Sequence, residues 1–201
     1  MNPPTHMNLK KIRRLMKKYS LVCPIRKANA YRVMAKALAT EYVAPNLANR
    51  EFESHGARKI LLTDIIYIIN GKASRCYMTT IIDAYTKEVL AWNLNLSLAI
   101  DFVLETVNQL VEKHKIALTS ETLIHSDQGA HYKSVKFIQL LKDYELRQSI
   151  SRKANCWDNA PQESFFGHMK DEIDISECTS FNELQQVISD WIYYYNNERF
   201  Q

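Results

Sequence analysis

The sequence predicts an α/β domain built on a mixed five-stranded sheet flanked by helices, preceded by a short basic helical segment. Two observations support this fold class. Between residues 60 and 96, three apolar, β-branched runs follow one another with short polar connections, which is typical of antiparallel strands. From residue 101 onward, apolar residues at helical spacing alternate with short apolar runs. With 46% hydrophobic residues in 201, the chain can bury the core of one good-sized domain.

Residues 1–50 are predicted to be a basic helical segment, part of a helix-turn-helix-type DNA-binding region with a linker at its end. Residues 1–40 carry ten Lys or Arg and no acidic residue, whereas the remainder carries 16 basic and 22 acidic residues. Helices are expected over 8–19 and 31–42. This charge distribution indicates an arm that faces nucleic acid, with a solvated surface helix as the alternative. The cations expected to contact DNA are Lys10, Lys11, Arg13, Arg14, Lys17 and Lys18.

The run 60–69 is continuously apolar and β-branched, so we expect a central strand that is buried on both faces. The Asn70-Gly71 pair ends this strand as a turn signal. A second strand over 75–84 and a third over 89–96 complete an antiparallel meander.

Six further elements follow the meander. They are a helix over 101–115, a strand over 122–126, a helix over 134–143, a strand over 146–151, and helices over 160–173 and 181–196 after a polar loop. The resulting order, β-β-β-α-β-α-β-α-α, is that of the ribonuclease-H-like fold. Residues 51–201 are therefore predicted to form one domain of this fold.

Three acidic residues lie where chemistry is expected. Asp64 interrupts the apolar first strand, and a buried carboxylate needs a cation or hydrogen-bond donors. Asp127 ends the fourth strand, which pairs beside the first in this topology. Glu163 begins a helix, with Asn159 as a plausible cap and Pro161 suited to the first turn. Taken singly, these acids could equally be a core aspartate, an Asx turn and a surface acid.

Carboxylates that converge at one sheet end repel one another unless metal ions neutralise them. Hard oxygen ligands select Mg²⁺ or Mn²⁺. Two such ions can activate an attacking oxygen and stabilise the leaving one during displacement at phosphorus. We therefore expect two divalent ions and a phosphodiester substrate.

The strings around these acids are distinctive. They are Thr63-Asp64-Ile65, His125-Ser126-Asp127-Gln128-Gly129-Ala130-His131-Tyr132, and Asn155-Cys156-Trp157-Asp158-Asn159-Ala160-Pro161-Gln162-Glu163-Ser164-Phe165-Phe166, with Lys170 beyond them. Over roughly residues 46–200, the chain resembles the catalytic core of bacterial insertion-sequence transposases with retrovirus-integrase-like cores and a D-D-(35)-E signature, the IS-three family. The run 194–199 also resembles that family's closing Tyr-Asn-x-x-Arg element.

The resemblance implies that Asp64, Asp127 and Glu163 are the metal-binding catalytic triad and that Lys170 lies near DNA. Such enzymes nick a transposon end, and the freed 3′-hydroxyl attacks a second phosphodiester. The implied partners are double-stranded DNA (transposon ends and target) and further copies of the chain in a homo-oligomer. Additional DNA contacts are predicted at His125, His131, Asn159, Arg152, Lys153 and Arg199, with the two histidines alternatively orienting the loop.

Family members usually have a longer helix-turn-helix region and continue past the closing element, so the chain is expected to be an isolated core or a truncated copy. The rival function is therefore a catalytically inactive, DNA-binding remnant that competes with a full-length transposase. A nuclease acting on RNA–DNA hybrids is a weaker alternative. No signal peptide or apolar run of membrane-spanning length is visible, so a cytoplasmic protein without membrane contact is expected. The four scattered cysteines are expected to be reduced thiols.

Overall fold

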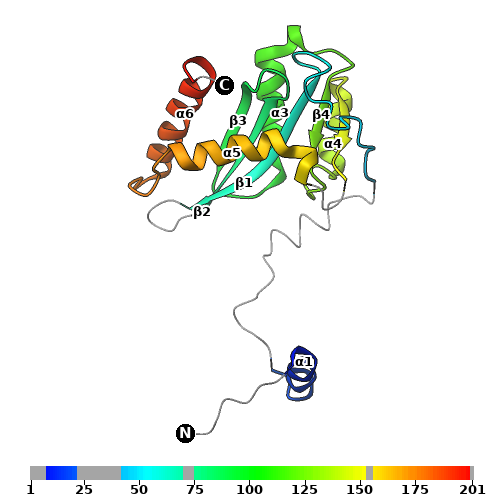
Figure 1. The fold of residues 1–201 in the computed structure, drawn as a ribbon, viewed down its shortest axis with the longest axis vertical. Helices are drawn as coiled ribbons and strands as arrows, with labels where there is room; N and C mark the ends of the chain where they lie inside the picture. Colours follow the sequence, from blue (N-terminus) through cyan, green and yellow to red (C-terminus); the bar gives the residue numbers. More distant parts are fainter. Residues whose placement is uncertain (1–7, 22–41, 70–74, 153–155, 200–201) are drawn as a thin grey trace.

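The computed structural model describes residues 8–21, 42–69, 75–152 and 156–199 (Figure 1). The strands are β1 (Ile60–Ile69), β2 (Arg75–Asp83), β3 (Val89–Asn95), β4 (Leu123–Ser126) and β5 (Arg147–Ile150). The helices are α1 (Leu9–Lys18), α3 (Ile100–His114), α4 (Val135–Asp143), α5 (Ala160–Glu172) and α6 (Phe181–Asn197), with short 3₁₀ turns η1 (Lys115–Ala117) and η2 (Cys156–Asn159).

The predicted elements within the described residues are confirmed, and their ends differ from the predictions by one residue at most. The expected helix over 31–42 and the Asn70-Gly71 turn lie outside the described residues. The two 3₁₀ turns were not predicted, because three or four residues are too few to show a period. The second of them, η2, occupies the end of the region expected to be a polar loop and leads directly into α5.

The strand order in the sheet is β3-β2-β1-β4-β5. Strand β1 pairs antiparallel with β2 along nearly its whole length, from Leu61 opposite Asp83 to Ile69 opposite Arg75. On its other side β1 pairs in parallel with β4 only over Ile60–Leu62. Since β4 ends at Ser126, most of β1 runs on past it, and this edge of the sheet is open where β4 stops.

The sheet separates two hydrophobic cores, and β1 contributes to both because its side chains alternate between the faces. Leu61 and Ile65 pack into the core formed with α3 and α4. Leu62 and Ile66 pack into the core formed with α5 and α6. The prediction of a central strand is confirmed, and burial on both faces holds for Ile60–Thr63, whereas Tyr67 and Ile69 in the second half are exposed. Figure 1 shows α5 crossing the sheet over β1, with α6 beside β3 and α4 on the side of β4. Helix α4 contacts β5 at the edge of the sheet.

Helix α1 differs from the other helices because none of its residues is buried. It begins at Asn8, whose side chain accepts a hydrogen bond from the Lys11 amide at 2.9 Å. Its six cations are exposed, and its first turn has no acidic residue.

Two cysteines can be described, Cys76 and Cys178, and both are buried free thiols, as expected. No helix in the described part of the chain is long and apolar enough to span a membrane.

Candidate active site at the carboxyl end of strand β4

Asp64 is the fifth residue of β1 and lies opposite Thr80 of β2. By the alternation of the strand it lies on the face that carries α5. One carboxylate oxygen, Oδ1, accepts a hydrogen bond from the Ile65 amide at 2.7 Å. Burial raises the pKa of Asp64 to about 7, and the charges of Asp127 and Glu163 act in the same direction. Asp127 and Glu163 therefore both lie within electrostatic reach of Asp64.

Asp127 follows the last residue of β4, and its Oδ1 accepts a hydrogen bond from the Gly129 amide at 2.7 Å. This contact is the Asx turn considered as an alternative at the sequence level. Burial raises the pKa of Asp127 as well. A Cβ added at Gly129 would lie only 2.7 Å from Asp127 Oδ1 and 3.3 Å from Tyr132 Cδ2. Glycine is thus required here so that the backbone can approach the carboxylate closely.

Glu163 lies in the first turn of α5 and is exposed. Gln162, directly before Glu163, and Phe165, two residues after it, are buried and anchor the helix against the sheet. Gln162 donates a side-chain hydrogen bond to Thr80 Oγ1, and Thr80 is the residue opposite Asp64. This contact holds the start of α5 over the part of β1 that carries Asp64.

The donor set fits a divalent cation, since the three side chains offer carboxylate oxygens and the charges of Asp127 and Glu163 both disfavour ionised Asp64. Among the residues that the structure describes, however, no three His, Cys, Asp or Glu side chains lie close enough together, as they stand, to hold a metal ion. Both aspartates direct Oδ1 at a backbone amide. A metal ion held by all three acids would therefore require their side chains to move closer together.

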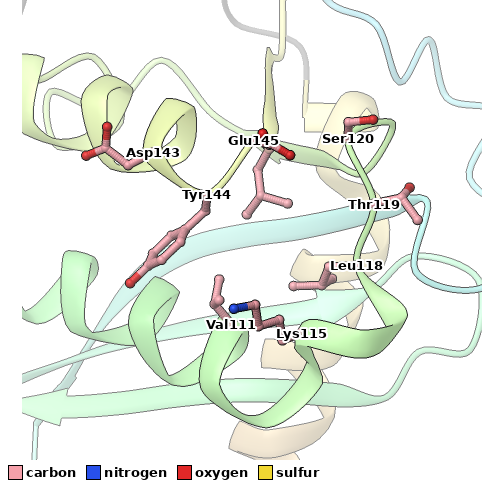
Figure 2. A pocket seen from close by; sticks show the side chains of 9 residues that line it. Val111, Lys115, Leu118, Thr119, Ser120, Asp143, Tyr144 and Glu145 are labelled. Atoms are coloured by element: carbon pink, nitrogen blue, oxygen red, sulfur yellow. The ribbon is translucent and has the colours of Figure 1, made fainter.

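A cavity of about 480 Å³ opens beside the two aspartates, lined by Asp64, Asp127 and the loop 128–132. A second cavity, of about 350 Å³, lies between the ends of α3 and α4, next to Ser120 and Glu145 (Figure 2). The second cavity is near the amino end of β4, and no member of the predicted triad lines it. The first is therefore the candidate active-site cavity.

Asp158 lies in the string that precedes Glu163 and is held by an extensive set of hydrogen bonds. Its side chain is 1% exposed and accepts five hydrogen bonds. Oδ1 accepts from Arg50 Nε at 2.7 Å and Arg152 Nη2 at 2.8 Å. Oδ2 accepts from Asn46 Nδ2 at 2.9 Å, and from the Arg152 amide and Nε at 3.0 Å each. Arg152 above all, with Arg50, holds the pKa of Asp158 well below its usual range.

His125 connects this cluster to β4. Its ring is buried and lies 3.0 Å, through Nε2, from the main-chain carbonyl of Asp158. A carbonyl only accepts, so Nε2 carries the proton and Nδ1 accepts from Ser149 Oγ at 2.8 Å. The same Ser149 oxygen accepts from the amides of Leu47 and Ala48. Burial lowers the pKa of His125. The ring therefore fixes the end of β4 against the linker and the start of α5.

Both histidines that were predicted to contact DNA are hydrogen-bonded within the protein. In this conformation neither ring nitrogen of His125 is available to a phosphate, and His131 bonds the Leu98 carbonyl through Nε2 at 2.9 Å. The predicted cap by Asn159 is wrong. The residue occupies the cap position of α5, but its side chain makes no capping bond, because η2 runs straight into the helix. Its buried Oδ1 has no hydrogen-bond partner among the described residues. Lys170 is exposed on α5.

Two of the predicted DNA-binding arginines are engaged within the protein. Arg152 pairs with Asp158, as described, although half of its side chain is exposed. Arg199 pairs with Glu172 at 2.9 and 3.0 Å and lies over the Tyr195 ring. Lys153 lies outside the described residues. Contacts of all these residues with DNA remain predictions.

The comparison with protein families gives two matches, both described as integrase core domain, over residues 54–156 and 144–200. The chain is 31% identical over 195 residues to the putative transposase InsK for insertion sequence element IS150 of Escherichia coli, a match covering 96% of this chain and 66% of that protein. It is 30% identical over 198 residues to an uncharacterized transposase-like protein of Haemophilus influenzae, covering 97% and 88%. Transposase InsF for insertion sequence IS3A of Escherichia coli is 26% identical over 158 residues, covering 74% and 54%. The chain thus spans about two thirds of InsK and about half of InsF.

Solved structures with a similar fold include the HTLV-2 integrase catalytic core domain in complex with magnesium. Its TM-score is 0.55 at 14% identity, and the match covers 72% of this chain and 90% of that one. The simian T-cell lymphotropic virus intasome in complex with PP2A regulatory subunit B56 gamma gives a TM-score of 0.58 at 12% identity, covering 82% and 57%. At these identities the likeness concerns the fold, and it confirms the predicted ribonuclease-H-like architecture.

Proposed function

Because this chain belongs to the integrase core family of bacterial insertion-sequence transposases, we propose that it is the catalytic core of a metal-dependent DNA transposase. In this proposal it cleaves phosphodiester bonds at the ends of its element and transfers the freed strand ends to target DNA. One observation carries the proposal: Asp64 and Asp127, far apart along the chain, line one cavity, and the charges of Asp127 and Glu163 both act to raise the pKa of Asp64.

Asp64, Asp127 and Glu163 would hold the divalent ions, Mg²⁺ or Mn²⁺. When bound, two such ions supply the positive charge that activates an attacking oxygen and stabilises a leaving one at phosphorus. The protein's own contribution is positional. The strand β1 holds Asp64, the Gly129 amide orients Asp127, and the Gln162–Thr80 contact holds the start of α5. A bound cation would neutralise the acids and remove the repulsion between them, and this is the physical reason for cation binding here.

Double-stranded DNA would be held by cations outside this acidic edge. Lys170 follows Glu163 by two helical turns, so it lies on the same face of α5 and would contact a phosphate near the cut. The six cations of α1 would bind the DNA backbone without reading sequence. We further propose that the protein acts in the cytoplasm as a homo-oligomer on DNA, since a structural neighbour is an intasome.

The test is a cleavage assay with Mn²⁺ and DNA carrying the ends of the element. We expect the wild type to nick this DNA and Asp127→Asn to reduce the rate at least 100-fold, with an unchanged unfolding temperature or a higher one. Asp101→Asn is the matched control, because Asp101 is an exposed acid on α3. Equal cleavage by wild type and Asp127→Asn would remove the enzymatic proposal.

The rival, a DNA-binding remnant without activity, is supported by the absence of an assembled metal-binding group among the described residues. Calorimetric titration with Mn²⁺ in the absence of DNA separates the two. A remnant would bind DNA but neither bind Mn²⁺ through Asp127 nor cleave.

A further inference from the structure

Two tyrosines form one wall of the candidate active-site cavity. Tyr67 of β1 and Tyr77 of β2 are direct cross-strand partners, so their side chains lie next to each other on the same face of the sheet. Tyr67 is 67% exposed, whereas Tyr77 packs partly against the core that contains Ile65. Both tyrosines line the same cavity of about 480 Å³ as Asp64 and Asp127.

The open edge of β1 explains how one cavity can be lined by both the aspartates and the two tyrosines. Asp64 and Tyr67 point to opposite faces, because they are separated by an odd number of positions along the strand. Beyond Leu62, β1 has no pairing with β4, so the cavity can extend around the exposed edge. Three residues of strand span about 10 Å, which is the reach of the nucleotides next to a phosphate bound at Asp64.

The chemistry of the wall favours a base over a phosphate. Among the described residues, the lining of this cavity contains no Lys or Arg, and beside the carboxylates, Gln128 and His131 it consists of apolar and aromatic residues. Such a surface repels a phosphate that is not bound to metal, whereas an aromatic ring offers its face to any nucleobase. A single exposed tyrosine needs no ligand, but two adjacent rings beside the acidic centre form a platform.

We propose that Tyr67 and Tyr77 form a stacking site for an unpaired base adjacent to the phosphodiester that is cut. The inference rests on the proposed function and deepens it, because it assigns the place where the DNA end is separated from its complementary strand. Stacking on an aromatic ring is possible for every base, so this site would hold the strand end in place without selecting a particular base.

The probe is a short DNA duplex with three unpaired nucleotides at one 3′ end, the middle one being 2-aminopurine. The full chain is titrated into this DNA with Ca²⁺ present, and the emission of 2-aminopurine, which stacking quenches, is recorded. Wild type and Tyr67→Phe should quench. Tyr67→Ala and Tyr77→Ala should lose most of the quenching, and Tyr67→Ala should bind the overhang DNA about tenfold more weakly. Blunt duplex should be bound equally by all variants.

Tyr85→Ala is the matched control, since Tyr85 is 49% exposed just past the other end of β2. It should quench as the wild type does. An unquenched wild type, or equal quenching by wild type and Tyr67→Ala, would overturn the inference. A change of oligomeric state in Tyr67→Ala with unaltered quenching would also overturn it and assign the ring to a contact between protein copies. Because the readout is binding, it remains interpretable if the Asp127→Asn cleavage test shows no enzymatic activity.

Discussion

Replacing Asp158 by asparagine should destabilise the folded protein by about 3 kcal/mol. The carboxylate is buried and accepts five hydrogen bonds, four of them from two guanidinium groups and the Arg152 amide. An asparagine of the same shape has only one acceptor oxygen, and its NH₂ group would face donors. Breaking a buried ion pair costs about 3 to 5 kcal/mol. The lower end applies here, because Arg50 and Arg152 are 43% and 51% exposed and can regain water.

Urea unfolding followed by circular dichroism measures this difference. For a chain of this length, about 3 kcal/mol corresponds to a fall of roughly 6 to 12 °C in the melting temperature. Glu121→Gln is the matched control. Its carboxylate also accepts from a cation, Lys59 at 3.0 Å, but it is 74% exposed. Losing the Lys59–Glu121 ion pair should shift the unfolding midpoint only slightly, since exposed ion pairs contribute little to the free energy of unfolding.

The pH dependence gives a second check on the same residue. The pKa of Asp158 in the folded protein lies below its value in the unfolded chain, so the stabilisation is present at neutral pH and is lost as pH falls below about 4. The difference between wild type and Asp158→Asn should therefore be constant above pH 5 and shrink in acid. Equal unfolding free energies for Asp158→Asn and Glu121→Gln, or a difference that does not change with pH down to 3, would refute the reasoning.

Further predictions concern the arm and the turn after β4. Deleting residues 1–45 should flatten the dependence of DNA affinity on salt by up to about nine units of log–log slope, because ten Lys and Arg would be lost, six of them in α1. Fluorescence anisotropy measures this slope, and an unchanged slope would show that the segment does not contribute to DNA binding. Gly129→Ala should cost about 1 to 3 kcal/mol and lower Mn²⁺-dependent cleavage at least tenfold, since the new Cβ would displace the Asp127 carboxylate. Gly167→Ala, which meets no atom within 4 Å in α5, should instead stabilise the protein by about 0.5 to 1 kcal/mol, and a loss of cleavage there would contradict the steric account.

The strands and helices could be predicted closely because each is encoded by a local pattern. The ten-residue apolar run of β1 is too long and too rich in β-branched residues to be an edge strand, and the helices α3 and α6 show clear helical spacing. The adjacency of β1 and β4 followed from the connection rules for such an order of elements. The same topology predicted that Asp127 and Glu163 approach Asp64, and both are near enough to act on its pKa.

The pairing of individual polar side chains could not be predicted from the sequence. Arg152 was predicted to contact DNA by its charge, but its guanidinium is bound to Asp158, while Arg50 reaches the same carboxylate from 108 residues away. Arg199 is likewise bound to Glu172, 27 residues earlier. No period or motif marks such pairs, because they depend on how loops approach one another after the sheet has formed. The unused capping position at Asn159 has the same cause.

Because the side chains of β1 alternate between two cores, insertions and deletions within this strand would disrupt the fold. Adding or deleting one residue before Asp64 within this strand would exchange the faces of all the side chains that follow, so the carboxylate would enter the aliphatic layer beneath α3; after a deletion Ile65 would occupy its place, and after an insertion Thr63 would. Length variation among descendants of this sequence should therefore avoid the middle of β1 and accumulate in the hairpin beyond it, where the frame of the strand is not affected.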